Sequence, residues 1–219
     1  MSNINVLLVD DHVVIREALA NLLNENEEIS VVAQANNIQK ALHDVRVFPI
    51  DVAIVDLSLG QQNGLDLVRS ITEIYPLVKC LVFSMYPEAL YAERSLRAGA
   101  KGYVMKSESP DVLISAIKKV YADEIALSRL MTKALISSHS SEIFAPVTTS
   151  FSLQSLGDRE LEILLLVGKG NLTKEIAQRL NLSVKTVDAV RQKLKVKLGL
   201  GSASDLVKFA IEYANSINT

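Results

Sequence analysis

The sequence predicts an α/β domain followed by an all-α domain. Up to residue 122, short apolar runs alternate with longer amphipathic stretches, whereas the rest of the chain has helical patterns only. Such alternation is typical of a parallel sheet with helices on both faces. A stretch rich in serine and threonine, at 137–155, separates the two patterns and has the composition of a linker.

Five runs in the first domain have the composition of buried strands. They consist mostly of branched apolar residues, as expected where both faces of a parallel sheet are covered. The strands are expected at Asn5–Val9, Ile29–Ala33, Val52–Val55, Cys80–Phe83 and Gly102–Met105.

Helices are expected between these strands, before the linker and throughout the second domain. Pro110 suits the first position of a helix, Ser183 suits an N-cap, and Gly199 suits the residue that follows a helix end. The expected helices are 13–25, 37–46, 64–75, 87–98, 110–122, 127–137, 158–168, 173–180, 184–198 and 203–215.

The chain therefore divides into a first domain at 1–122, a helical segment and linker at 123–151, and a second domain at 152–219. Residues 1–150 include 13 basic and 18 acidic residues, whereas residues 151–219 include 10 basic and 7 acidic residues. This asymmetry is typical of a control domain joined to an anion-binding domain. With 49% apolar residues and a net charge of −2, the composition excludes intrinsic disorder.

The composition also indicates a cytoplasmic protein that does not enter a membrane. The sequence has no uncharged apolar run of about 18 residues, the length that a membrane-spanning helix needs. The N-terminus has two early aspartates and no basic segment, unlike a signal peptide. The single cysteine, Cys80, can form neither an internal disulfide nor a zinc cage, and we expect it to be a small buried side chain.

Polar residues follow the predicted strands at the points where the strands end. Asp10 and Asp11 follow the first strand, Asp56 the third, Ser84 the fourth and Lys106 the fifth. Ligands bind at the carboxyl ends of the strands in open α/β sheets, so we expect these side chains to lie together. Carboxylate oxygens in an open, solvated site suit Mg²⁺.

This set of side chains fits phosphoryl transfer to a carboxylate. Asp56, neutralised by the metal, can act as a nucleophile toward phosphorus. Lys106 would offset the charge on the transferred oxygens, and Ser84 would hydrogen-bond the product phosphoryl group. A single acid after a strand is usually a helix cap or a loop residue, but polar residues at successive strand ends favour a site.

Residues 1–122 resemble a two-component receiver domain. The DDH triplet that begins at Asp10 and the nearby Arg16 resemble the NarL/FixJ family of response regulators. The resemblance implies the flavodoxin-like strand order 2-1-3-4-5. The matching residues are Asp10, Asp11, Asp56, Gly64 eight residues later, Ser84, and the segment GAKGYVMK at 99–106.

The resemblance also implies partners and ligands for the pocket. A sensor histidine kinase would donate its phosphoryl group to Asp56. Asp11, Asp56 and the backbone carbonyl of Ser58 would hold Mg²⁺, and Asp10 would bind the ion through water.

Ser84 and Tyr103 would couple phosphorylation to the face formed by the fourth and fifth helices, although an aromatic residue on a strand is more often a packing residue. Three positions depart from the family. Gly60 and Val13 stand where proline is common, and Met85 replaces a small residue. We hypothesise that Met85 slows the entry of water or small phosphodonors at the mouth of the pocket.

Residues 152–219 resemble a LuxR-type helix-turn-helix domain. A short helix, a three-residue turn and a longer helix form the geometry that places the second helix in the major groove of DNA. Gly157 stands where the family prefers threonine, so the first helix is expected to fray. The motifs of the family are KEIA at 174–177, NLSVKTV at 181–187 and KLGL at 197–200.

One face of the helix at 184–198 is polar and is expected to contact DNA, although a polar face can also be merely solvated. Asp188 and Ala189 depart from the family, which often has a basic and a polar residue there; they could contact cytosine N4 and a thymine methyl group. The residues expected to contact DNA are Thr173, Lys174, Lys185, Thr186, Asp188, Ala189, Gln192 and Lys193.

Together, the two resemblances predict a DNA-binding response regulator of transcription rather than an enzyme. Phosphorylation would shift it toward a homodimer that reads two half-sites on double-stranded DNA, and a contact with RNA polymerase is also possible. The last helix has an apolar edge suited either to dimer pairing or to packing on its own domain, formed by Leu206, Val207, Ala210 and Ile211.

Two other functions remain open. A phosphorylation-independent DNA-binding regulator would use a vestigial receiver for protein contacts only, and Gly60 and Met85 leave room for it. A Mg²⁺-dependent phosphatase would need a second catalytic acid soon after the nucleophile, but Leu57 and Ser58 follow Asp56.

Overall fold

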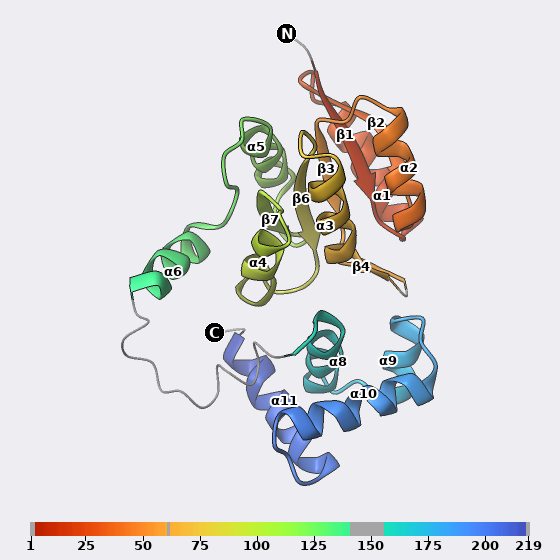
Figure 1. Ribbon diagram of the computed structural model, residues 1–219, viewed down its shortest axis with the longest axis vertical. Coiled ribbons are helices and arrows are strands. Elements are labelled where there is room, and N and C mark those ends of the chain that lie inside the picture. Colours follow the sequence, from red (N-terminus) through yellow and green to blue (C-terminus); the bar gives the residue numbers. More distant parts are fainter. Residues whose placement is uncertain (1–2, 61, 141–155, 218–219) are drawn as a thin grey trace. The chain divides into compact units, whose positions relative to one another are not determined.

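The computed structural model describes residues 3–60, 62–140 and 156–217 (Figure 1). The chain forms two compact units, residues 1–140 and 141–219. In the part of the chain that is described, no helix has the length and the apolar composition needed to cross a bilayer.

A parallel sheet forms the centre of the first unit, with the order β2-β1-β3-β6-β7 (Figure 1). The predicted order 2-1-3-4-5 is confirmed, because β6 and β7 are the fourth and fifth strands of this sheet along the chain. Val9 of β1 pairs with Val55 of β3, so the residues that follow these two strands are neighbours. The strands are β1 (Ile4–Val9), β2 (Ile29–Ala35), β3 (Val52–Val55), β6 (Lys79–Ser84) and β7 (Gly102–Met105).

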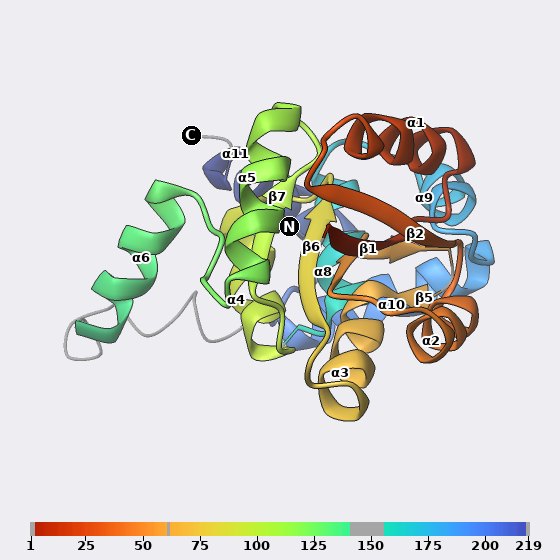
Figure 2. The same ribbon diagram turned by 90° about the horizontal axis from the view of Figure 1, so that it is seen from above.

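Helices cover both faces of this sheet (Figure 2). One face carries α1 (Val13–Asn24) and α5 (Pro110–Tyr121). The other carries α2 (Ile38–Val47), α3 (Gly64–Ile74) and α4 (Glu88–Arg97). Every residue of β3 is buried, as expected for a strand at the middle of a doubly covered sheet.

A small hairpin after β3 was not predicted. It consists of β4 (Ser58–Leu59) and β5 (Gln62–Asn63), and two-residue strands are too short to show a periodic pattern. Gly60 in its turn has a φ of +63°, a conformation closed to proline, whose ring fixes φ near −65°. The departure from the proline common in the family therefore follows from the shape of this turn.

The chain after α5 returns to the edge of the sheet. Ala126 forms a parallel bridge with Gly102, in which the Tyr103 N–H donates to the Ala126 carbonyl over 2.8 Å. The helix α6 (Arg129–Ser140) follows and corresponds to the helix expected at 127–137, with both ends shifted by two or three residues. Of the predicted linker at 137–155, residues 141–155 lie outside the described residues.

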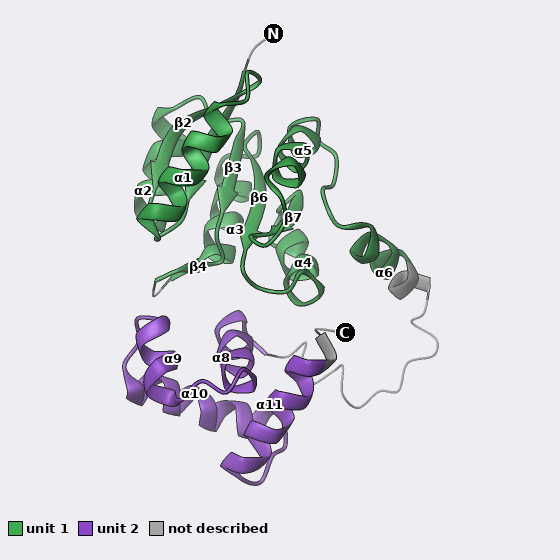
Figure 3. Cartoon of the chain, turned by 180° about the vertical axis from the view of Figure 1, so that it is seen from behind, with its two compact units in different colours: residues 1–140 green, residues 141–219 purple. Residues whose placement is uncertain are grey.

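The second unit is helical over its described residues (Figure 3). Two capping predictions are confirmed: the Ser183 side chain accepts from the Thr186 N–H over 3.0 Å, and Gly199 has a φ of +67°. Its helices are α8 (Asp158–Gly168), α9 (Thr173–Arg179), α10 (Val184–Lys197) and α11 (Ala203–Ile217).

The start of α8 does not need the threonine that the family prefers. The Gly157 N–H donates to the Glu160 carboxylate over 2.8 Å, and the helix begins at Asp158, where it was expected. The carboxylate thus supplies one half of a capping box at the start of α8.

The packing of α11 supports, for two of its four apolar residues, the alternative that this edge packs on its own domain. Leu206 and Ala210 are buried within their own unit, where α11 packs on α8. Ile211 is 41% exposed and Val207 is half-buried, so these two remain on the surface side of the helix.

Candidate functional site

The residues that follow β1, β3 and β7 form a compact cluster of charges at one edge of the sheet. Lys106 Nζ lies 2.6 Å from Asp10 Oδ2 and 2.7 Å from Asp56 Oδ2. All three side chains are only 6–7% exposed. The strand ends therefore bring one ammonium group between two carboxylates. Gly64 packs directly against the backbone of Asp56, where a Cβ would lie 2.0 Å from the Asp56 carbonyl oxygen.

Burial and charge oppose each other within this cluster. Burial would lower the pKa of the Lys106 ammonium, but the adjacent Asp56 and Asp10 carboxylates outweigh it and raise that pKa above its ordinary value. Burial raises the pKa of the Asp56 carboxyl, and the Lys106 charge and the Ser58 N–H work against it. Lys106 therefore stays charged, and it is the counter-ion that stabilises the ionised form of the buried Asp56 carboxyl.

Asp11 completes the acidic part of the pocket and is more open to solvent. One donor atom each from Asp10, Asp11, His12 and Asp56 lies within 4.8 Å of the others. The Asp11 side chain is 30% exposed, yet its Oδ1 atom is buried and makes no hydrogen bond to any described residue, although His12 Nδ1 lies 2.8 Å away. Clustered oxygen donors, one of them without a hydrogen bond, fit a hard divalent cation such as Mg²⁺.

Ser84 and Tyr103 meet at the start of α4. Ser84, at the end of β6, is fully buried and accepts a long hydrogen bond, 3.4 Å, from the Tyr86 N–H. The Tyr103 hydroxyl points inward and donates to the Tyr86 carbonyl over 2.8 Å. Burial raises the pKa of Tyr103, while its hydrogen bond with Ser84 works against that shift. Both residues thus lie between the charge cluster and α4.

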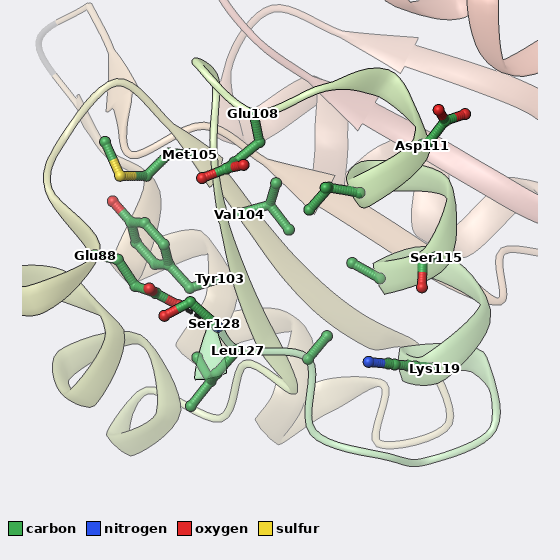
Figure 4. A pocket seen from close by; sticks show the side chains of 13 residues that line it. Glu88, Tyr103, Val104, Met105, Glu108, Asp111, Ser115, Lys119, Leu127 and Ser128 are labelled. Carbon is green, nitrogen blue, oxygen red and sulfur yellow. Dashed lines mark hydrogen bonds between the residues drawn. The ribbon is translucent and has the colours of Figure 1, made fainter. Parts of the chain in front are cut away.

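The same end of α4 is joined to the start of α6. Glu88 Oε1 accepts from the Ser128 N–H over 2.8 Å, beside a groove of about 470 Å³ that Tyr103, Met105 and Lys119 also line (Figure 4). The sequence pattern does not single out Glu88 and Ser128, because an acid at the start of a helix is common for its interaction with the helix dipole alone.

Two further residues lie where the sequence suggested. Met85 is 61% exposed and lines a groove of about 420 Å³ together with Val14 and Lys106, beside the charge cluster. Cys80 is buried, and burial raises the pKa of its thiol to about 12, so it is not poised as a nucleophile.

The second unit presents a polar face along α10. Val187 and Leu194 are fully buried on one side of this helix. The opposite side carries exposed residues at a spacing of three or four, which places them on one face. They are Lys185, Asp188, Ala189, Gln192 and Lys193, and Lys174 and Thr186 are exposed nearby.

Thr173 has a partner within the fold. It is half-buried, and its hydroxyl accepts from Arg191 Nη1 over 2.6 Å, which joins the start of α9 to the middle of α10. Arg191 was missed because its partner lies 18 residues away, outside any helical period. Lys197 similarly pairs with Glu160 over 2.6 Å and joins α10 to α8.

Comparison with known proteins adds to this geometry. Residues 6–118 match the family of response regulator receiver domains, and residues 154–210 match the luxR family of bacterial regulatory proteins. The oxygen regulatory protein NreC of Staphylococcus aureus (strain NCTC 8325 / PS 47) is 36% identical over 211 residues, which cover 94% of this chain and 96% of NreC.

Solved structures agree with the family match. RcsB from Salmonella enterica serovar Typhimurium, bound to promoter rprA in the presence of the phosphomimetic BeF3−, is 25% identical with a TM-score of 0.62 and covers 95% of this chain and 98% of its own. A LuxR-family two-component response regulator from Aurantimonas sp. SI85-9A1 is 29% identical, with a TM-score of 0.59, over 64% of this chain and 100% of its own. The chain therefore belongs to the NarL/FixJ family of two-component response regulators, which regulate transcription by binding DNA under the control of a phosphorylated receiver domain.

Proposed function

We propose that this regulator accepts a phosphoryl group at Asp56 from the phosphohistidine of a sensor kinase. The observation that carries the proposal is the pairing of Lys106 with both Asp10 and Asp56 beside the open Asp11 carboxylate. An Asp56 oxygen attacks phosphorus, and the O–P bond forms as the P–N bond to the kinase imidazole breaks.

The other residues of the pocket hold the charge that this transfer moves. Asp11, Asp56 and the Ser58 carbonyl would hold Mg²⁺, and Asp10 would bind it through water. When bound, the ion neutralises the carboxylates and the phosphoryl oxygens. Lys106 Nζ, which lies 2.7 Å from Asp56 Oδ2, would form an ion pair with one oxygen of the transferred group. The Ser84 hydroxyl would donate a hydrogen bond to another of these oxygens.

Movement of Ser84 would transmit the effect of phosphorylation from the pocket to α4. If its hydroxyl turns to the phosphoryl group, its hydrogen bonds with the Tyr86 N–H and with Tyr103 change. Tyr86 lies two residues before Glu88 at the start of α4. Because Glu88 holds the Ser128 N–H, a shift of α4 would reach α6 and the segment that leads to the second domain.

We propose that α10 lies in the major groove of double-stranded DNA. Lys185, Gln192 and Lys193 on its exposed face suit base edges and phosphates. Asp188 suits a cytosine N4 donor and Ala189 a thymine methyl group, so the operator would differ from that of relatives with basic residues there. Thr173, Lys174 and Thr186 would contact the backbone beside the groove.

Phosphorylation would favour a homodimer in which two such helices read half-sites one helical turn apart. Residues 1–122 would then be the receiver, 123–151 the connecting segment and 152–219 the DNA-binding domain. The protein would act in the cytoplasm and would have no catalytic role beyond its own phosphorylation. Once bound to DNA, the dimer would contact RNA polymerase.

The test compares the wild-type protein with Asp56→Asn, which keeps the size of the side chain. Both are incubated with Mg²⁺ and acetyl phosphate, and their intact mass and their retardation of promoter DNA are measured. The wild-type protein should gain one phosphoryl group and bind DNA more tightly, and the variant should do neither. Equal DNA binding without any gain in mass would instead support the phosphorylation-independent regulator, and rapid consumption of acetyl phosphate would support a phosphatase.

A further inference from the structure

Arg16, in the first turns of α1, makes a contact at the edge of the acidic pocket. Its Nη1 atom donates to the backbone carbonyl of Asp10 over 2.6 Å. Its Nε atom is buried and has no hydrogen-bond partner among the described residues. Arg16 is half-buried as a residue, but a buried donor atom without a partner is costly in a folded protein. The bond that Arg16 does make therefore needs a structural or functional reason.

The Asp10 carbonyl belongs to the peptide that joins the two acids of the pocket. Other groups of this turn have their own partners: the Asp10 N–H donates to the Ala35 carbonyl at the end of β2 over 3.1 Å, and the His12 N–H donates to Asp10 Oδ1 over 2.7 Å. Because the peptide unit is planar, fixing its carbonyl also fixes the position of the Asp11 Cα, from which the Asp11 side chain extends. Arg16 therefore holds the Asp10–Asp11 peptide in one orientation.

The charge of Arg16 acts in the opposite direction. Arg16 lines a cavity of about 10 Å³ together with Asp10, Asp56 and Phe83, so its charge belongs to the surroundings of the acidic pocket. A fixed positive charge at that place repels a divalent cation. By charge alone, removal of Arg16 would strengthen cation binding, whereas by positioning alone it would weaken it.

We propose that Arg16 is a positioning residue for the cation site. It orients the Asp10 and Asp11 carboxylates through the Asp10 carbonyl and so raises the affinity of the pocket for Mg²⁺, although its own charge opposes the ion. The inference rests on the proposed function, since it assumes that these carboxylates bind Mg²⁺.

The test measures Mg²⁺ affinity by titration calorimetry on the full chain, with thermal unfolding as a second readout. Arg16→Met removes the donors and the charge at similar length, and Arg16→Lys keeps one donor that can reach the Asp10 carbonyl. Groups that orient metal ligands typically contribute about 10- to 100-fold in affinity. We expect Arg16→Met to raise the Kd for Mg²⁺ about tenfold and Arg16→Lys to restore most of the loss. If Arg16→Met does not fold, the shorter Arg16→Gln takes its place with the same expectation.

Three results would overturn the proposal, and each is distinct. An unchanged or lower Kd in Arg16→Met, at any melting temperature, would mean that Arg16 only stabilises the fold or only repels the ion. If Arg16→Lys binds Mg²⁺ as weakly as Arg16→Met, the hydrogen bond to the Asp10 carbonyl does not account for the change in affinity. If the wild-type protein itself binds no Mg²⁺, while Asp11→Asn behaves identically, the proposed function fails together with this inference.

Discussion

The two units of this protein use charge in opposite ways. In the receiver, the charges of the site are buried: Lys106 is 6% exposed and lies between Asp10 and Asp56. In the second unit, Lys185 and Lys193 are exposed on α10. Buried charges act on one another over a few ångströms in a medium of low dielectric constant, whereas exposed basic groups can bind the phosphates of a polyanion and release its counterions.

This difference predicts where a lost charge is felt. Removal of a buried partner leaves an uncompensated charge inside the fold, so stability and chemistry change together. Removal of an exposed lysine leaves the fold intact and weakens DNA binding alone.

The largest effect is expected for Lys106→Met. The variant leaves Asp10 and Asp56 buried without a cation, and we expect the receiver to lose about 3 kcal/mol of unfolding free energy at neutral pH. Because a divalent cation would neutralise the same carboxylates, added Mg²⁺ should restore part of this loss. Urea unfolding with and without Mg²⁺ measures both effects.

The matched control is Lys185→Met on α10. Its unfolding free energy should change by less than about 0.5 kcal/mol, while DNA affinity falls and the slope of its salt dependence decreases by about 1. If Lys106→Met were as stable as the wild-type protein, or if Lys185→Met were strongly destabilised, burial would not decide how much stability a lost charge costs.

A smaller effect, confined to the second unit, is expected for Gly168→Ala. A Cβ at Gly168 would lie 2.2 Å from the Ala210 carbonyl oxygen, so α8 and α11 would have to separate. Overpacking of this kind costs about 2 kcal/mol. Hydrogen exchange should show faster opening of α8 and α11 and an unchanged receiver.

Gly157→Ala is the matched control in the same unit, because the nearest atom to its added Cβ would be Glu160 Oε2 at 3.6 Å. Its cost should stay below about 1 kcal/mol. Equal effects of the two substitutions would mean that close helix packing does not hold the second unit together.

The charge cluster could be predicted from the sequence because the strand pattern carries the information. Once β1, β3 and β7 are assigned to one parallel sheet, the residues after them must share an edge, and this brings Asp10, Asp56 and Lys106 together. The helix limits follow from the same periodic pattern to within a few residues, whereas the order of the strands was implied by the resemblance to receiver domains.

The contacts that tie elements to one another could not be predicted in this way. Arg191 with Thr173 and Glu88 with Ser128 join residues 18 and 40 positions apart, and no period relates them. The bond of Arg16 to a backbone carbonyl leaves no trace in residue types, because every residue offers that acceptor. Such contacts depend on how the elements pack, which the sequence pattern does not encode.

The smallest effect concerns Glu160 and the pH dependence of the second unit. Burial raises the pKa of Glu160, but the Lys197 ammonium and the Gly157 N–H outweigh it and hold the pKa below its ordinary value. A carboxyl with a lowered pKa in the folded state stabilises the fold above its unfolded pKa and loses that contribution as the pH falls through the folded pKa. Because Lys197 is 40% exposed, solvent screening limits the contribution to about 0.5 kcal/mol.

Hydrogen exchange of α8 between pH 7 and pH 3 should therefore show a small loss of protection in acid. Lys197→Met should reduce this loss, and the control Lys208→Met, on the exposed surface of α11, should not. An equal loss in all three proteins would assign the pH dependence to another group.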